Sequence, residues 1–118
     1  PSMLADATAG EPSAVIRERV IRARAIQAER FREAEGIHAN AMMNAALLSE
    51  HCRLDAATST MLEQAMTRLS LSARAYDRIL KVARTIADLA GRTEIARADV
   101  AEAINYRSLD RGTWGNVN

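Results

Sequence analysis

One segment, residues 71–91, constrains the fold more than any other part of the chain. Its sequence is LSARAYDRILKVARTIADLAG, in which apolar side chains recur at spacings of three and four residues. Side chains at this spacing lie on one face of an α-helix. The apolar face consists of Tyr76, Ile79, Leu80, Ala83, Ile86, Ala87 and Ala90. The segment therefore predicts a long helix that packs against other helices.

A second face of this helix carries the cations Arg74, Arg78 and Lys81. The first two fall in the opening turns, where the helix dipole favours acidic side chains. Two explanations remain open for the charges. Asp77 with Lys81, and Arg84 with Asp88, are spaced to form surface salt bridges along the helix. Alternatively, the three cations bind an anion.

Composition limits the classes of protein to consider. The chain has 118 residues, is 48% hydrophobic and 26% charged, and carries a formal net charge of +1. These values are typical of one globular domain without the global positive field of a dedicated nucleic-acid binder. The single cysteine, Cys52, excludes an internal disulfide. No apolar run is long enough to span a membrane, and no signal peptide is recognisable, so we expect a cytoplasmic protein without a membrane partner.

The ends of the chain lack helical periodicity. The sequence begins at Pro1 without an initiator methionine, which favours a domain taken from a longer protein. We expect residues 1–12 to be a flexible leader, residues 13–111 to be the folded domain and residues 112–118 to be a tail.

Capping residues and apolar spacing predict the remaining helices. Ser13 can cap a first helix that runs to Glu35 and ends at Gly36. Residues 38–52 predict a loop and a shorter helix that buries Met43, Leu47 and Leu48. The later helices are predicted from Asp55, as N-cap, to Leu69, from Ser72 to Gly91, and from Arg97 to Tyr106 with Asp99 in its first turn. The fold class is therefore all-α, a small bundle of four to five helices.

Motifs for independent catalysis are missing. No glycine lies in the GxxxxGK[ST] pattern that binds nucleotide phosphates. His51 and Cys52 are adjacent but point apart on a helix, so we interpret Cys52 as a core residue and predict no metal site. His38 is interpreted as a surface residue. The carboxylates Glu29, Glu33 and Glu35 are interpreted as a solvated face rather than as catalytic acids.

The first predicted helix is rich in arginine. Its arginines alternate with glutamates around the helix, which favours a solvated face with ion pairs. Arg17 and Arg22 remain candidates for contacts with a phosphate, with DNA or with a neighbouring subunit, as does Lys81. The arginines are Arg17, Arg19, Arg22, Arg24, Arg30 and Arg32.

Four segments resemble one known domain. LSARAYDRILKVARTIADLAG is similar to the signature helix of the C-terminal domain in magnesium-chelatase-like AAA+ ATPases, the bacterial group that includes competence protein ComM and the YifB proteins. SAVIRERVIRARAIQAERF resembles the start of that domain, CRLDAATSTMLEQAMTRL its preceding helix and DVAEAINYRSLDR its end. The resemblance is weakest over residues 36–50, so no role is carried over to the helix expected there.

The resemblance implies an AAA+ lid. In the family, this helical domain follows an α/β domain that binds ATP with Mg²⁺, and an arginine of the sensor-2 type at the start of the long helix reaches the ATP phosphates. Arg74 matches that arginine, and Arg78 is the next candidate. The chain alone would bind no cofactor and catalyse nothing, while its parent would be an ATPase. Whether Arg74 acts in its own subunit or in a neighbour is left open.

The resemblance also implies the partners of the parent protein. These are the upstream α/β domain and neighbouring subunits of a homo-hexameric ring. ComM-type members act on DNA by branch migration in transformation and recombination, whereas the chelatases drive insertion of magnesium into a porphyrin.

Two other functions remain in competition. The predicted helix from Asp55, the turn at residues 70–72 and the helix bearing Arg74 match the outline of a helix-turn-helix DNA-binding module. A pure oligomerisation bundle is the other alternative, and in it Arg74 would be dispensable.

Overall fold

The computed structural model describes residues 13–109, with side chains described to Tyr106. The described part contains five α-helices, one short 3₁₀-helix and no strand. The helical elements are α2 (Ser13–Arg30), η1 (Asn40–Met42), α3 (Ala45–His51), α4 (Ala56–Arg68), α5 (Ala73–Leu89) and α6 (Arg97–Leu109). The predicted all-α bundle is therefore confirmed. The predicted leader, residues 1–12, and tail, residues 112–118, lie outside the described residues.

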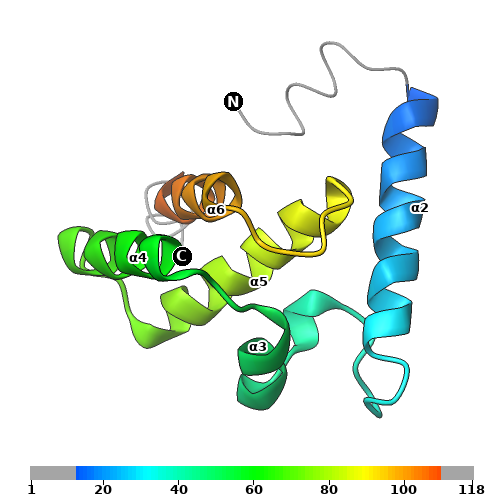
Figure 1. Ribbon diagram of the computed structural model, residues 1–118, viewed down its shortest axis with the longest axis horizontal. Helices are drawn as coiled ribbons and strands as arrows, with labels where there is room; N and C mark the ends of the chain where they lie inside the picture. The colour runs from blue at the N-terminus through cyan, green and yellow to red at the C-terminus, as the bar shows by residue number, and fades with distance from the viewer. Residues whose placement is uncertain (1–12, 110–118) are drawn as a thin grey trace.

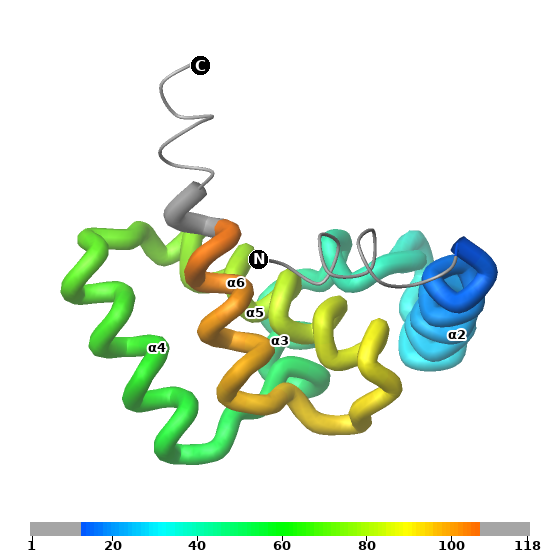
Figure 2. Tube along the Cα trace, turned by 90° about the horizontal axis from the view of Figure 1, so that it is seen from above, coloured from blue at the N-terminus to red at the C-terminus, as the bar shows by residue number. Residues whose placement is uncertain are grey.

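Helix α5 is the central element of the bundle. It contacts α2, η1, α3 and α6, while α4 packs on α6 (Figure 1). Viewed from above, α2 lies at the opposite side of α5 from α4 and α6 (Figure 2). Burial follows the predicted stripe, because Ile79, Leu80, Ala83, Ile86 and Ala87 are all buried in the core. Within the stripe, Tyr76 is only half-buried and Ala90 is exposed, so the prediction was wrong for Ala90.

Both ends of α5 form as predicted. The Ser72 hydroxyl accepts a hydrogen bond from the backbone N–H of Ala75 at 3.2 Å. At the other end Gly91 has a φ of 76°, in the left-handed region that glycine adopts without steric cost. The backbone N–H of Arg92 then donates to the Ala87 carbonyl at 2.9 Å, which completes a Schellman motif. Ala90 is exposed because it is the C-cap residue of this motif.

Asp55 caps α4 as the sequence predicted. Its carboxylate accepts a hydrogen bond from the backbone N–H of Thr58 at 2.7 Å. This bond lowers the pKa of Asp55, because it favours the charged form of the carboxyl group.

The junction between α4 and α5 places a serine in a conformation that favours glycine. Ser70 has a φ of 55°, and the next backbone N–H, that of Leu71, donates to the Met66 carbonyl at 3.0 Å. We expect Ser70→Gly to stabilise the chain by about 0.5–1 kcal/mol, because it removes the left-handed strain of an L-residue. Urea denaturation measures the change. Ser49→Gly, within α3, is the matched control and should destabilise; a loss of stability at Ser70 as well would contradict the argument.

The first helix is shorter than predicted. It ends at Arg30 rather than Glu35, and residues 31–37 continue as tight turns in which Ala34 and Ile37 donate to the carbonyls of Phe31 and Ala34. The turns bury Phe31, which is 3% exposed, and a continued α-helix would carry the chain away from the core. Gly36, with a φ of 80°, lies within these turns.

Two smaller boundaries also differ from prediction. Met43 is buried as predicted, but it follows η1 and precedes α3 instead of belonging to that helix. The last helix extends to Leu109 instead of ending at Tyr106. No helix among residues 13–109 is both long and apolar enough to cross a bilayer.

Candidate functional site

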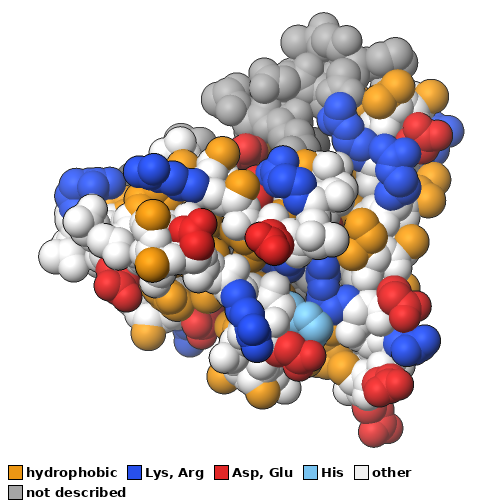
Figure 3. Space-filling view, in the orientation of Figure 1, with side chains coloured by type: hydrophobic (Ala, Val, Ile, Leu, Met, Phe, Trp, Pro, Cys, Tyr) orange, Lys and Arg blue, Asp and Glu red, His pale blue; other side chains and the backbone are white. Residues whose placement is uncertain are grey.

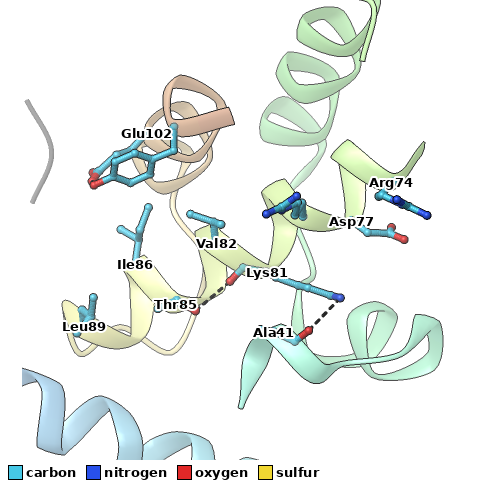
Figure 4. Close-up of a pocket in the computed structure, with 11 residues that line it drawn as sticks. Ala41, Arg74, Asp77, Lys81, Val82, Thr85, Ile86, Leu89 and Glu102 are labelled. Carbon is cyan, nitrogen blue, oxygen red and sulfur yellow. Dashed lines mark hydrogen bonds between the residues drawn. The ribbon is translucent and has the colours of Figure 1, made fainter. Parts of the chain in front are cut away.

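A groove on the surface of α5 collects the candidate cations. It has a volume of about 750 Å³ and lies between α5, η1 and α6 (Figure 4). Figure 4 shows Arg74, Asp77 and Lys81 at one end of the groove and the apolar Ile86 and Leu89, with Glu102 above them, at the other. The lining residues are Ala41, Arg74, Asp77, Arg78, Lys81, Val82, Thr85, Ile86, Leu89, Glu102 and Tyr106.

The structure brings Arg74, Arg78 and Lys81 to the same groove. Arg74 and Arg78 are exposed, and neither forms an ion pair with another residue of the described part of the chain. Both belong to the N-terminal half of α5, and Arg74 lies in its first turn, where the helix dipole disfavours a cation. Their guanidinium groups can therefore approach an anion without first breaking an ion pair.

Lys81 is anchored instead of free. Its Nζ donates to the backbone carbonyl of Ala41 at 3.2 Å (Figure 4). The surface salt bridge that the spacing of Asp77 and Lys81 allowed does not form, because the lysine reaches across to η1. The contact leaves the ammonium on the wall of the groove, where it adds to the positive charge of the two arginines.

The other candidates, Arg17 and Arg22, lie on α2 and do not line the groove. Arg22 is 64% exposed and forms a surface ion pair with Glu18 at 3.7 Å. In Figure 3, Lys and Arg side chains gather along the N-terminal half of α2, and acidic side chains gather near its C-terminal end. The predicted solvated face is confirmed for the acids, since Glu29, Glu33 and Glu35 are all exposed.

A buried charge network centred on Asp88, which we call the Asp88 network, was not predicted from the sequence. It comprises Arg30, Asn40, Arg84 and Asp88. Arg30 donates two hydrogen bonds to the Asp88 carboxylate, each of 2.8 Å, and a third of 2.8 Å to the side-chain oxygen of Asn40. Asn40 donates to Asp88 at 2.8 Å and to the Thr85 hydroxyl at 3.1 Å. The network joins α2, η1 and α5.

Arg84 extends the Asp88 network to the end of α3 and to the loop between α5 and α6. Its Nε donates to Asp88 at 3.2 Å, and its terminal nitrogens donate to the carbonyls of His51, Arg92 and Thr93 at 3.3, 3.0 and 3.0 Å. The Arg84 and Asp88 side chains are only 4% and 0% exposed. The ion pair of Arg84 and Asp88 that their spacing suggested is confirmed, but it is buried instead of lying on the surface. The assignment of Arg30 to the solvated face of α2 was wrong.

A signal for the Asp88 network was present in the sequence. Arg84 and Asp88 lie one and two turns after Leu80, at the edge of the apolar stripe, so charged residues border the buried face. Charges placed on a buried face require partners of opposite sign. The partner Arg30 lies 58 residues away, and no local pattern identifies it.

Cys52 and His51 are part of the core region. Cys52 is 5% exposed, and burial raises the pKa of its thiol to about 11, which keeps it protonated and unreactive at neutral pH. The His51 ring packs edge-on against Phe31 at a centroid distance of 5.8 Å. The described residues contain no group of three or more His, Cys, Asp or Glu side chains arranged to hold a metal ion.

Comparison with known proteins identifies the family. The model of the family described as magnesium chelatase, subunit ChlI C-terminal, matches residues 10–107. The chain belongs to this family. The match covers all of α2 to α5, including the groove and the Asp88 network.

Two curated relatives are similar over most of the chain. Competence protein ComM of Haemophilus influenzae is 44% identical over 102 residues, which are 86% of this chain and 19% of that protein. Protein YifB of Escherichia coli, described as uncharacterized, is 38% identical over 102 residues, with the same two coverages of 86% and 19%. The chain thus spans about a fifth of the length of these relatives. No solved structure matches it significantly.

Proposed function

We propose that this chain is the helical lid of a magnesium-chelatase-like AAA+ ATPase and that Arg74 contacts the phosphates of ATP bound by a separate α/β domain. The observation that carries the proposal is the pair of exposed arginines, Arg74 and Arg78, in the N-terminal half of α5 and without an ion pair among the described residues. An arginine fork matches the oxygens of a phosphate and stabilises negative charge during phosphoryl transfer. Membership of the family supports the proposal.

The site suits an anion on chemical grounds. Arg74, Arg78 and Lys81 supply three positive charges along one wall of the groove. In the bound state, Arg74 would contact the terminal phosphates and Arg78 would support it one turn further along α5. ATP supplies the phosphoryl group, and the Mg²⁺ that accompanies it would be held by the α/β domain.

The proposal extends to the parent protein as a ring-shaped motor that acts on DNA. The arginine-rich N-terminal half of α2 supports this substrate, because cationic helix surfaces attract the phosphate backbone (Figure 3). The lid itself should bind duplex DNA weakly. Tight, steeply salt-dependent binding by the isolated chain would contradict the lid and favour the helix-turn-helix alternative formed by α4 and α5.

Arg74→Ala in the intact ATPase tests the proposal. We expect kcat for ATP hydrolysis to fall at least tenfold, because a charge that stabilises the transferring phosphoryl group is lost. Arg74→Lys should retain part of the rate, because lysine keeps the positive charge but lacks the two parallel donors of the guanidinium group. Steady-state release of inorganic phosphate gives the measurement. Arg68→Ala, which removes an exposed arginine outside the groove, is the control. A rate within twofold of the unmodified protein for Arg74→Ala would contradict the proposal.

A further inference from the structure

Helix α2 is held to the bundle near its C-terminal end by polar contacts and by Phe31, which follows the helix and is buried in the core. Ala23 is its only buried residue, although the helix is 18 residues long. Close to its end, Arg30 binds Asp88 and Asn40, and the Gln27 side chain accepts a hydrogen bond from the backbone N–H of Asn40 at 3.0 Å. Directional hydrogen bonds at this end therefore contribute to the angle between α2 and α5, together with the packing of Phe31.

Arg30 has the geometry of a clamp. Its two terminal nitrogens bind the two oxygens of Asp88 at 2.8 Å each, and such a bidentate pair fixes orientation as well as distance. Its side chain is 10% exposed, so water competes weakly for these bonds. Asn40 binds both residues and keeps η1 in the same junction.

Asp88 and Arg74 lie at opposite ends of one rigid helix. A helix of this length spans about 25 Å, and a tilt of about 5° at one end moves the other end by about 2 Å. Rates of enzymatic reactions fall steeply when a contributing group is misplaced by about 1 Å. Control of the tilt of α5 relative to α2 is therefore control of the position of Arg74.

From this arrangement we propose that Arg30 is a positioning residue that acts through Arg74: its clamp on Asp88 fixes α5 relative to α2, and hence Arg74 relative to bound ATP. The inference rests on the proposed function, in which the nucleotide-binding domain precedes α2. Arg30 touches neither ATP nor Arg74. Its effect on ATP hydrolysis requires the guanidinium of Arg74 to be present.

The test is a double-mutant cycle in the intact ATPase, with Arg30→Gln and Arg74→Ala made singly and together. The fold should survive Arg30→Gln, because Asp88 keeps its contact with Arg84 at 3.1 Å and glutamine can still donate one hydrogen bond. We expect Arg30→Gln to lower kcat at least fivefold in the native background and to have no further effect when Arg74 is alanine. Arg30→Lys, which keeps the charge but not the fork, should give an intermediate kcat and serves if Arg30→Gln folds poorly.

Arg32→Gln is the matched control. Arg32 lies two residues away, is 66% exposed, and pairs only with the surface residues Glu29 and Glu33 among the described residues. The kcat of the Arg32→Gln variant for ATP hydrolysis should stay within twofold of that of the unmodified protein.

Each other outcome has one interpretation. An unchanged kcat for Arg30→Gln, together with a loss for Arg74→Ala, overturns the positioning role and leaves the proposed function intact. If Arg30→Gln lowers kcat as much in the Arg74→Ala background as in the native background, the positioning role is overturned too, because Arg30 would then act through general stability. An unchanged kcat for Arg74→Ala overturns the proposed function itself.

Discussion

Replacing Asp88 with alanine is expected to destabilise the chain by about 3–5 kcal/mol, because it leaves two arginines without their carboxylate in the interior. Arg84 is 3% exposed and cannot turn to solvent without repacking the core. Arg30 would lose two of the three hydrogen bonds that its guanidinium donates. For a domain of this size, the loss corresponds to a fall in Tm of more than about 10 °C.

The variant Asp88→Asn tests how much of this stability comes from the charge of Asp88, because it removes the charge and keeps the shape of the side chain. The amide has nearly the same volume as the carboxylate, but its NH₂ group would face arginine donors where an oxygen now accepts. We expect a loss of about 2–4 kcal/mol, close to that of the alanine variant. Guanidinium denaturation of each variant supplies the free energies of unfolding.

The control for both variants is Glu33→Ala. The Glu33 side chain is 87% exposed and forms one surface ion pair, with Arg32, within residues 13–109, so its removal should change stability by less than about 0.5 kcal/mol. A loss of under 1 kcal/mol at Asp88 would show that the Asp88 network contributes little to the fold.

Helix ends were predictable where a single residue determines them. Asp55, Ser72 and Gly91 act through their own side chain or backbone within three residues along the chain, so the sequence carries the whole cause. The end of α2 was not predictable in this way. It depends on the burial of Phe31 against parts of the core that are distant in sequence, and a run of good helix formers to Glu35 does not reveal that contact.

In the candidate site, too, contacts within one helix were predictable and tertiary contacts were not. Arg74, Arg78 and Lys81 were placed together correctly, because residues spaced by one turn on one helix must share a face. The partner of Lys81 was not foreseen, since Ala41 lies in the segment where periodicity and resemblance were both weakest. Arg30 was misassigned because an arginine among exposed arginines is locally indistinguishable from them. Only tertiary structure shows that this one meets Asp88.

Ile79→Ala and Ile21→Ala make the same chemical change at two helical positions with opposite environments. Ile79 is 1% exposed in the centre of α5, whereas Ile21 is 58% exposed on α2. We expect Ile79→Ala to cost about 2–5 kcal/mol, because it removes buried methyl groups and leaves a cavity that helices on both sides of α5 can fill only partly. Ile21→Ala should be neutral or slightly stabilising, because alanine has the higher helix propensity.

The comparison isolates packing from the intrinsic preferences of the helix. Both variants gain helix propensity by the same substitution, so the difference between their free energies of unfolding reports the burial of Ile79 alone. Thermal and urea denaturation should agree on that difference. Equal effects at the two positions would mean that α5 is not the centre of the core, and a loss at Ile21 above about 1 kcal/mol would show that α2 buries a face against another part of the molecule.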